Sequence, residues 1–310
     1  GVDSIVGANL AAVLSGSSVV CGLPRQIAAT QAARIGGCEI LRETISGEGG
    51  IRQVLSRISP GCVVFCGPGA ESCWSQSPRA AFTEEAVSTA RMWARAAHEA
   101  GAPFTCISSD AVFTGPWMFH PESSRSLCDS RQARVLRGIE AAALAEHASA
   151  LVVRTHVFGW MPDACGPGWI ERELAGLEDG TARGQDPFRH ATPMLATDFA
   201  TVLEQAWQEN LSGVFHIAGS ERISPAGFLA RIAQEFDLPV PAIGRPESLV
   251  ERPQGFGCGE TSLRTGSIRR AMGVSLPSLT DGVRRLREQY ENGYRDRLNG
   301  SAAPPQGQAA

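Results

Sequence analysis

Short apolar runs alternate with longer amphipathic stretches through the first half of the chain. The apolar runs are bounded by Gly, Pro or Ser and predict buried strands at 18–23, 37–41, 61–67, 103–108 and 150–155. Between them, the spacing of apolar positions predicts helices over 51–58, 82–100 and 131–147. This alternation indicates βαβ units. We therefore expect an α/β fold with a doubly wound, mainly parallel sheet of the Rossmann type.

The pattern changes after about residue 156, where a Gly/Pro/Trp-rich stretch interrupts it. Beyond this point we expect a strand at 213–219 and helices at 170–177, 197–209, 225–236, 269–272 and 279–291. These elements predict an NAD(P)-binding Rossmann domain over 1–158 and a smaller substrate-binding subdomain, with returning Rossmann elements, over 159–298. The remaining residues, 299–310, lack large apolar side chains to bury in a core, so we expect a disordered tail.

Composition narrows the classes of function. Hydrophobic residues make up 43% of the chain and charged residues 19%, as in soluble globular proteins, and the net charge of −4 offers no basic field to nucleic acid or anionic lipid. No apolar run approaches a membrane span, and no secretion signal is visible. The nine cysteines form no C-x-x-C pair, so we expect no metal site and a reducing, cytoplasmic location.

The first residues have the spacing of a dinucleotide phosphate loop. Gly1, Ser4 and Gly7 fit G-x-x-G-x-x-G with Ser in the middle position. Because free N–H groups at a helix start bind phosphate, Gly1, Ser4, Ile5 and Val6 are candidate cofactor contacts. No strand precedes the motif in this sequence. Either the first strand lies upstream, or the segment is an ordinary helix start.

The ends of the later strands supply further candidate contacts to a cofactor. NAD-binding proteins place an acid after the second strand, whereas Arg25 stands here and suits the 2′-phosphate of NADP. A solvated surface arginine is the equal alternative. With Cys66, Gly67 and Ser108 at the ends of two other strands, the expected cofactor is NADP (or NAD).

The segment PFTCISSDAVFTG at 103–115 resembles the dTDP-4-dehydrorhamnose reductase family, whose members read roughly ISTDYVFDG here. That family belongs to the extended short-chain dehydrogenase/reductases. Stretches such as SPGCVVFCGPGAESCWSQSP, ALVVRTHVFG and ATPMLATDFATVLEQ agree with it in order and spacing. The resemblance covers most of the chain and implies a nucleotide-linked sugar as the small-molecule partner.

The same resemblance implies a Ser/Thr, Tyr and Lys catalytic set. Ser109 matches the Ser/Thr that polarises the substrate carbonyl. The family's Tyr/Lys block falls within 126–146, where Arg131 or Gln132 takes the Tyr place and Val135 or Leu136 the Lys place. The proton relay of the family therefore has neither of its two characteristic groups.

No lysine and no suitably placed tyrosine elsewhere in the chain can replace this pair. The chain contains no lysine, and its two tyrosines, Tyr290 and Tyr294, lie in a polar C-terminal segment where we expect solvent-facing roles. The resemblance also implies a fourth catalytic residue, an Asn on the helix after the fourth strand, and Glu85 takes its place in this chain. His120 is the candidate general acid, because histidine titrates near neutral pH; a structural loop histidine is the alternative.

Other side chains are candidates for contact with a substrate. Trp74, Trp117 and His156 follow predicted strands, where open α/β sheets bind ligands. Arg189 and Arg252 lie in later loops and are candidates by their charge. Tryptophan could stack on a base or sugar, and arginine could pair with a diphosphate. Loop-packing tryptophans and surface arginines are the alternatives.

Three hypotheses of function follow. The first is an NAD(P)-binding protein without standard reductase activity, which acts as a sensor, regulatory subunit or assembly partner and forms a homodimer or binds a regulatory partner. The second is an active nucleotide-sugar reductase or epimerase with other acid–base groups. The third is a structural partner that binds no nucleotide.

Overall fold

The computed structural model describes residues 1–25, 32, 34–43, 45–75, 81–182, 186, 188–241 and 255–300. The expected tail lies outside these ranges from residue 301 onward, as does Arg252. Asn299, the first residue of the expected tail, is instead held in place: it follows the last helix, and its side chain donates to Asp163 at 2.7 Å.

The strands are short, and their bounds are β1 Cys21–Gly22, β2 Arg34–Ile35, β3 Cys38–Ile40, β4 Val63–Phe65, β5 Phe104–Ser109, β6 Leu151–Thr155, β7 Val157–Phe158, β8 Met194–Leu195 and β9 Gly213–His216. The helices are α1 Ile5–Leu14, α2 Gly47–Ile58, α3 Glu84–Glu99, α4 Arg131–Glu146, α5 Trp169–Glu178, α6 Ala196–Gln208, α7 Pro225–Glu235, α8 Gly266–Met272, α9 Leu279–Glu291 and α10 Tyr294–Leu298.

Several helices begin at a Ser or Thr whose hydroxyl accepts a backbone N–H of the first turn. These caps are Ser4, Thr83, Ser130, Ser224 and Ser278. Such a cap satisfies one of the N–H groups that a helix start leaves unpaired. The local sequence therefore sets where α1, α3, α4, α7 and α9 start.

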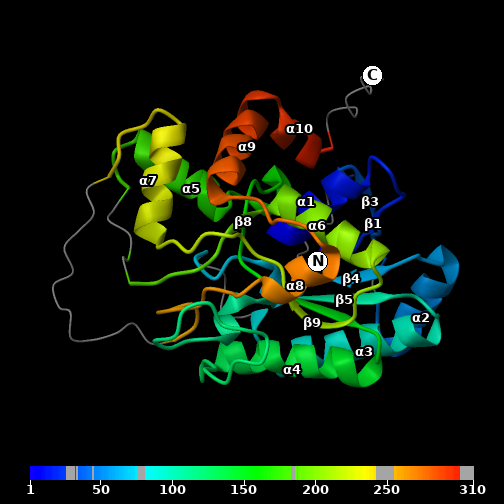
Figure 1. Ribbon diagram of the computed structural model, residues 1–310. Helices are drawn as coiled ribbons and strands as arrows, with labels where there is room; N and C mark the ends of the chain where they lie inside the picture. The colour runs from blue at the N-terminus through cyan, green and yellow to red at the C-terminus, as the bar shows by residue number, and fades with distance from the viewer. Residues whose placement is uncertain are drawn as a thin grey trace.

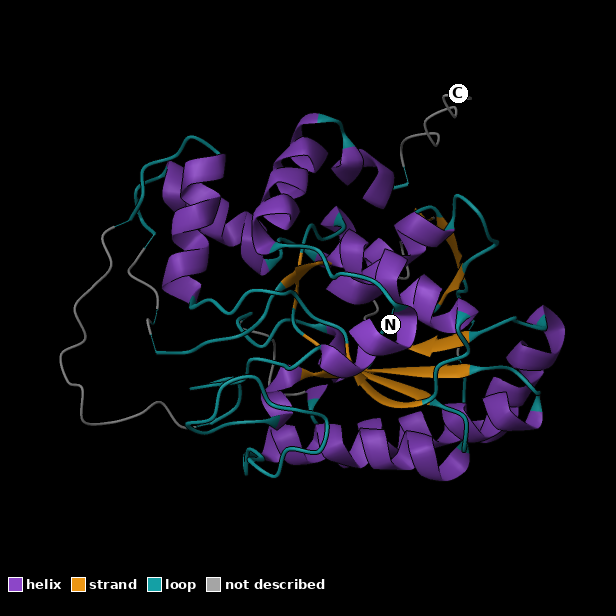
Figure 2. Cartoon of the chain, viewed as in Figure 1, coloured by secondary structure: helices purple, strands orange, loops and turns teal. Residues whose placement is uncertain are grey.

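The central sheet is parallel and has the order β4-β5-β6-β9. Helices α3 and α4 cover one face, where Ala94, Ile139 and Ala143 pack against Phe104 and Val152. Helices α1, α6 and α8 cover the other face, and Figures 1 and 2 show the resulting layers. This architecture confirms the expected doubly wound α/β fold.

A second, three-stranded sheet of order β1-β3-β2 lies beside α1. Gly1 stands between the two sheets: its amino group donates to Leu23 O at 2.5 Å, and a Cβ on Gly1 would lie 1.9 Å from Cys66 O. Leu23 follows β1 and Cys66 follows β4. The start of the chain therefore packs between the ends of β1 and β4, one strand from each sheet.

Helices α5, α7, α9 and α10 gather on one side of the molecule (Figure 1). Their apolar faces share a core with α1 that includes Trp160, Trp169, Phe228 and Leu286. None of the described helices is both long and apolar enough to cross a membrane.

The predicted strands and helices are present, with ends shifted by a few residues. Four short elements were not predicted, namely β2, β7, β8 and α10. Tyr294 belongs to α10 and is 5% exposed, so its expected solvent-facing role is wrong. Trp160 and Trp169 are also buried, and Trp169 is the first residue of α5.

Candidate functional site

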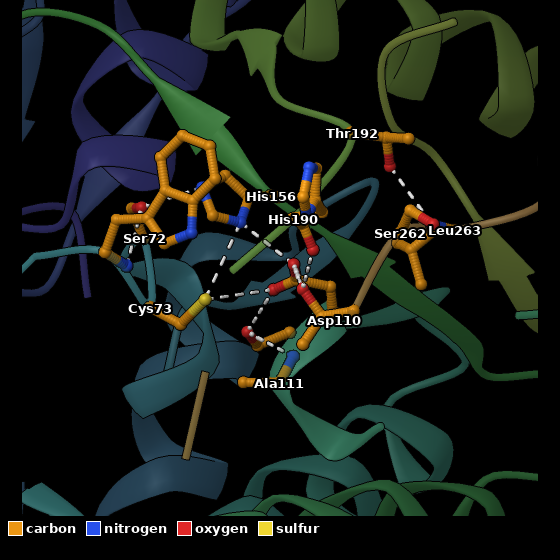
Figure 3. A network of polar contacts seen from close by, with 12 residues as sticks. Ser72, Cys73, Asp110, Ala111, His156, His190, Thr192, Ser262 and Leu263 are labelled. Atoms are coloured by element: carbon orange, nitrogen blue, oxygen red, sulfur yellow. Dashed lines mark hydrogen bonds and ion pairs between the residues drawn. The ribbon is translucent and has the colours of Figure 1, made fainter. Parts of the chain in front are cut away.

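Polar side chains converge at the carboxyl ends of β5 and β6. Ser109, the last residue of β5, is buried; its hydroxyl donates to Asp110 Oδ1 at 3.0 Å and accepts from the Ala111 N–H at 3.2 Å. Figure 3 shows this network. In open α/β sheets this edge is where ligands bind, so the fold brings Ser109 to the expected place.

Asp110 is paired with His156, which follows β6. His156 Nδ1 lies 2.9 Å from Asp110 Oδ2, and both side chains are buried. Thr261 donates to the same carboxylate oxygen at 2.6 Å. Burial opposes ionisation of this carboxyl, but His156, Thr261 and Ser109 outweigh it and lower the pKa of Asp110. The buried carboxylate is therefore stabilised by hydrogen bonds from three sides.

Cys73 completes this group from the loop after β4. Its sulfur lies 3.5 Å from Asp110 Oδ1 and 3.6 Å from His156 Nδ1. Burial and the neighbouring Asp110 raise the pKa of the Cys73 thiol well above its ordinary value. A thiol in this setting is not activated as a nucleophile.

An aromatic cavity of about 20 Å³ lies next to this cluster. Trp74, Trp169, Phe228 and Arg189 are among its lining residues, and the Trp74 ring packs edge-on against His156 with centroids 4.4 Å apart. The space suffices for about one water molecule. The structure thus brings together three of the predicted substrate contacts, Trp74, His156 and Arg189.

The start of α1 has the close packing expected of a phosphate loop. Ser4 caps the helix, donating to Gly1 O and accepting from the Gly7 N–H. A Cβ on Gly7 would lie 2.2 Å from Gly1 O, so only glycine fits there. Ile5 and Val6 bury their side chains in the core, which leaves their backbone as the part that could contact a ligand.

Arg25 lies beside this helix start but already has anionic partners. Its guanidinium is 2.7 Å from Glu71 Oε1 and 3.4 Å from Asp3 Oδ1, and it also donates to Gly67 O. Burial raises the pKa of the Glu71 carboxyl, and Arg25 and the nearby backbone of Ile5 only partly offset this. A side chain of the protein therefore occupies the anion position at the start of α1.

The helix that should carry the Tyr/Lys pair is α4. Val135 and Leu136 are buried in its apolar core, whereas Arg131 is exposed. Glu140 forms a two-pronged ion pair with Arg154 at 2.7 and 2.9 Å and accepts a hydrogen bond from Ser108 at 2.5 Å. The expected cofactor contact Ser108 therefore has a structural partner.

The remaining predicted residues lie elsewhere. His120 is buried against Phe113, and both of its ring nitrogens have polar neighbours, Ser124 Oγ at 2.9 Å and Glu260 O at 3.2 Å. These contacts favour the structural alternative for His120. Trp117 is 70% exposed, and Glu85 is exposed in the first turn of α3.

Sequence reasoning missed Cys73, Asp110 and Glu71. Asp110 adjoins the recognised Ser109 and could have been found from that position alone. Cys73 and Glu71 lie in the stretch at 59–78 that resembles the family, but only the folded sheet brings them to His156 and Arg25. No spacing along the chain links these pairs.

A parallel sheet with helices on both faces and a polar cluster at its carboxyl edge defines a Rossmann-type α/β protein. The family model of the RmlD substrate binding domain matches residues 1–292. The chain therefore belongs to the RmlD family. Comparison with curated protein sequences finds no match.

Solved structures with the same fold include enzymes that act on nucleotide sugars. A dTDP-4-dehydrorhamnose reductase from Clostridium acetobutylicum has a TM-score of 0.72 at 15% identity, covering 94% of this chain and 98% of that one. The reductase from Bacillus anthracis in complex with NADP has 0.66 at 16%, covering 81% and 89%. The UDP-glucose 4-epimerase from Thermotoga maritima has 0.73 at 13%, covering 95% and 98%.

Proposed function

We propose that this chain is an NAD(P)-binding protein of the nucleotide-sugar reductase/epimerase type that lacks the standard Tyr/Lys relay and has a binding, regulatory or assembly role. The proposal rests on the residue types found in α4, the helix that should hold the Tyr and the Lys. The relay needs a phenol beside an ammonium group within hydrogen-bond reach of the substrate carbonyl. The block at 126–146 contains neither Tyr nor Lys, and the candidate Lys places are buried aliphatic residues.

The environment of Ser109 supports the same proposal. Its hydroxyl donates to a carboxylate, Asp110, rather than to a phenol. Glu140 on α4 is held by Arg154 and Ser108, so it has no free position toward a substrate. The groups that remain can bind and orient a ligand.

The residues present fit a nicotinamide cofactor at the start of α1. Close packing leaves no room for a side chain on Gly1 or Gly7 at the helix start, and a phosphate that replaced the Glu71 carboxylate would meet the Arg25 guanidinium. When bound, such a cofactor supplies or accepts a hydride. In this chain, the α1 backbone, Arg25 and Gly67 would hold its phosphates and ribose.

Substitution of Glu71 provides a test of this cofactor-binding site. Because its carboxylate lies at the helix start and pairs with Arg25, a phosphate must displace it. We expect Glu71→Gln to bind NADPH about tenfold more tightly than the parent chain, which corresponds to about 1.4 kcal/mol. Glu99→Gln, which removes an exposed carboxylate from an ion pair with Arg52, is the matched control and should leave the affinity unchanged.

The function itself is tested by titrating the purified protein with NADPH and NADH, followed by cofactor fluorescence, and by assaying turnover of a dTDP-4-keto-sugar. Binding without turnover is the expected result. Turnover at a rate normal for the family would overturn the proposal. Failure of both the parent and Glu71→Gln to bind either cofactor would favour the structural partner.

A second candidate is an active reductase or epimerase with other acid–base groups. The observation in its favour is that the buried Asp110–His156 pair lies next to Ser109 and the aromatic cavity. If turnover is found, comparing His156→Asn with His120→Asn identifies the group responsible. If only His120→Asn loses turnover, His120 is the general acid, as the sequence predicts.

A further inference from the structure

Three side chains from separate segments bring a sulfur, a nitrogen and an oxygen into one place. Cys73 lies in the loop after β4, Asp110 follows β5, and His156 follows β6 (Figure 3). One ligand-type atom from each lies within 4.8 Å of the other two. Asp110 and His156 are buried, and Cys73 is half-buried.

The separations from the Cys73 sulfur match those around a tetrahedral zinc ion, whereas His156 Nδ1 and Asp110 Oδ2 lie closer together, at 2.9 Å. With Zn–S of about 2.3 Å and Zn–N or Zn–O of about 2.0–2.1 Å, the ligand atoms of such an ion are about 3.3–3.6 Å apart. The Cys73 sulfur lies 3.5 Å from Asp110 Oδ1 and 3.6 Å from His156 Nδ1. Little movement would be needed to place an ion between these atoms.

Neighbouring groups hold two of the three side chains in the required orientation. Ser72 Oγ lies 3.0 Å from His156 Nε2, which directs Nδ1 toward Cys73 and Asp110. Thr261 and Ser109 donate to the two oxygens of Asp110. Contacts of this kind to the outer nitrogen and oxygen atoms are typical of metal ligands and fix their geometry.

We propose that Cys73, Asp110 and His156 form a zinc-binding site with one open coordination position. A set of one sulfur, one nitrogen and one oxygen suits zinc better than magnesium or calcium, which prefer oxygen ligands alone. Three protein ligands leave the fourth tetrahedral position for water or an oxygen of a bound molecule. The site goes beyond the proposed cofactor function and does not depend on it.

This proposal reverses the expectation of no metal site drawn from the sequence. That expectation depended on short spacings such as C-x-x-C. Here the ligands are separated by 37 and 46 residues along the chain, the separations of the Cys73–Asp110 and Asp110–His156 contacts. The parallel strands bring them together at one edge of the sheet.

Cobalt substitution in the full chain tests the site directly, because a Co²⁺–thiolate bond gives a charge-transfer band that oxygen or nitrogen ligation does not. We expect the parent protein, stripped of metal, to bind one equivalent of Co²⁺ with this band and to release it to Zn²⁺. Cys73→Ser should lose the band. Cys165→Ser, which changes another half-buried free cysteine, should keep it.

Further variants distinguish a preformed zinc site from adventitious zinc binding. Ser72→Ala should keep the thiolate band and weaken zinc binding about 10–100-fold, measured by competition with a chromogenic chelator. Zinc should also raise the Tm of the parent and not that of Cys73→Ser. Absence of the band in the parent, which needs no variant to fold, would overturn the proposal, as would equal zinc affinity in the parent and Cys73→Ser.

Discussion

The ring of His216 is buried at the end of β9, next to Arg154 on the paired strand. Burial, followed by the positive charge of Arg154, lowers the pKa of His216 from 6.5 to about 3. The folded protein therefore keeps this histidine neutral at pH values where the unfolded chain protonates it. Between about pH 6.5 and 3 the unfolded state binds more protons, so acid favours unfolding.

We predict that this one group contributes a loss of stability of at most about 1.4 kcal/mol for each pH unit below 6.5. Urea unfolding of the parent and of His216→Gln at pH 7.5, 6.5 and 5.5 measures it, and the variant should show the shallower dependence. His98→Gln changes an exposed ring on α3 and serves as the control. Parallel curves for parent and His216→Gln would contradict the prediction.

Single residues also show where sequence reasoning stops. Ser109 is recognisable because a stretch of nine residues around it resembles a known family. His120 has the chemistry of a general acid, but its ring is held by Ser124 and Glu260. The polar neighbours of Tyr294 predict a solvent-facing position, whereas α10 turns this side chain, with Leu298, into the core. The sequence shows which chemical group a residue carries, but it does not show which other groups that side chain contacts in the fold.

At the scale of elements, α4 and β6 are joined by a buried ion pair. The side chains of Glu140 and Arg154 are 7% and 10% exposed, and Arg154 also lies over the Phe113 ring, 5.0 Å from its centroid. Burial of both charges is tolerated because each is paired and hydrogen-bonded. Removing one partner would leave the other charge buried without compensation.

We expect Glu140→Gln to lower the free energy of unfolding by about 3–5 kcal/mol. Glu146→Gln affects the same helix but breaks a more exposed pair with Arg95, so its cost should stay below about 1 kcal/mol. Urea denaturation of the three proteins gives both values. Equal losses for the two variants would show that burial does not distinguish these pairs.

The long elements were predictable because each carries its own signal. The strands over 103–108 and 150–155 are continuous apolar runs, and Thr83 and Ser224 mark helix starts by their capping chemistry. The unpredicted β7 and β8 have two residues each, and among the described strands each pairs with the other alone. A strand of that length has no periodicity, and the tertiary fold alone creates it.

At the scale of the whole molecule, α10 connects the end of the described chain to its beginning. Tyr294 on α10 donates to Asn9 Oδ1 on α1 at 2.9 Å, and Asn9 Nδ2 in turn donates to Trp160 O at 2.9 Å. These buried bonds join the start of the chain, the loop after β7 and the C-terminal helices. The two domains expected from the sequence therefore share a core along α1.

We predict that Tyr294→Phe destabilises the fold by about 1–3 kcal/mol, because it leaves a buried amide oxygen without its donor. Tyr290→Phe is the matched control: Tyr290 is 52% exposed, so its hydroxyl should matter little. Thermal and urea unfolding of both variants measure the difference. A neutral Tyr294→Phe would mean that packing alone holds α10 on α1.

The order β4-β5-β6-β9 makes β4 an edge of the central sheet, and its three residues, Val63 to Phe65, are only half-buried. Along that edge, no strand among the described residues pairs with its outer amide and carbonyl groups. Such groups form a template onto which an extended segment of another polypeptide can add. A further extended segment lying against β4 would therefore continue the parallel sheet, and a charged side chain in place of Val64 should weaken that pairing.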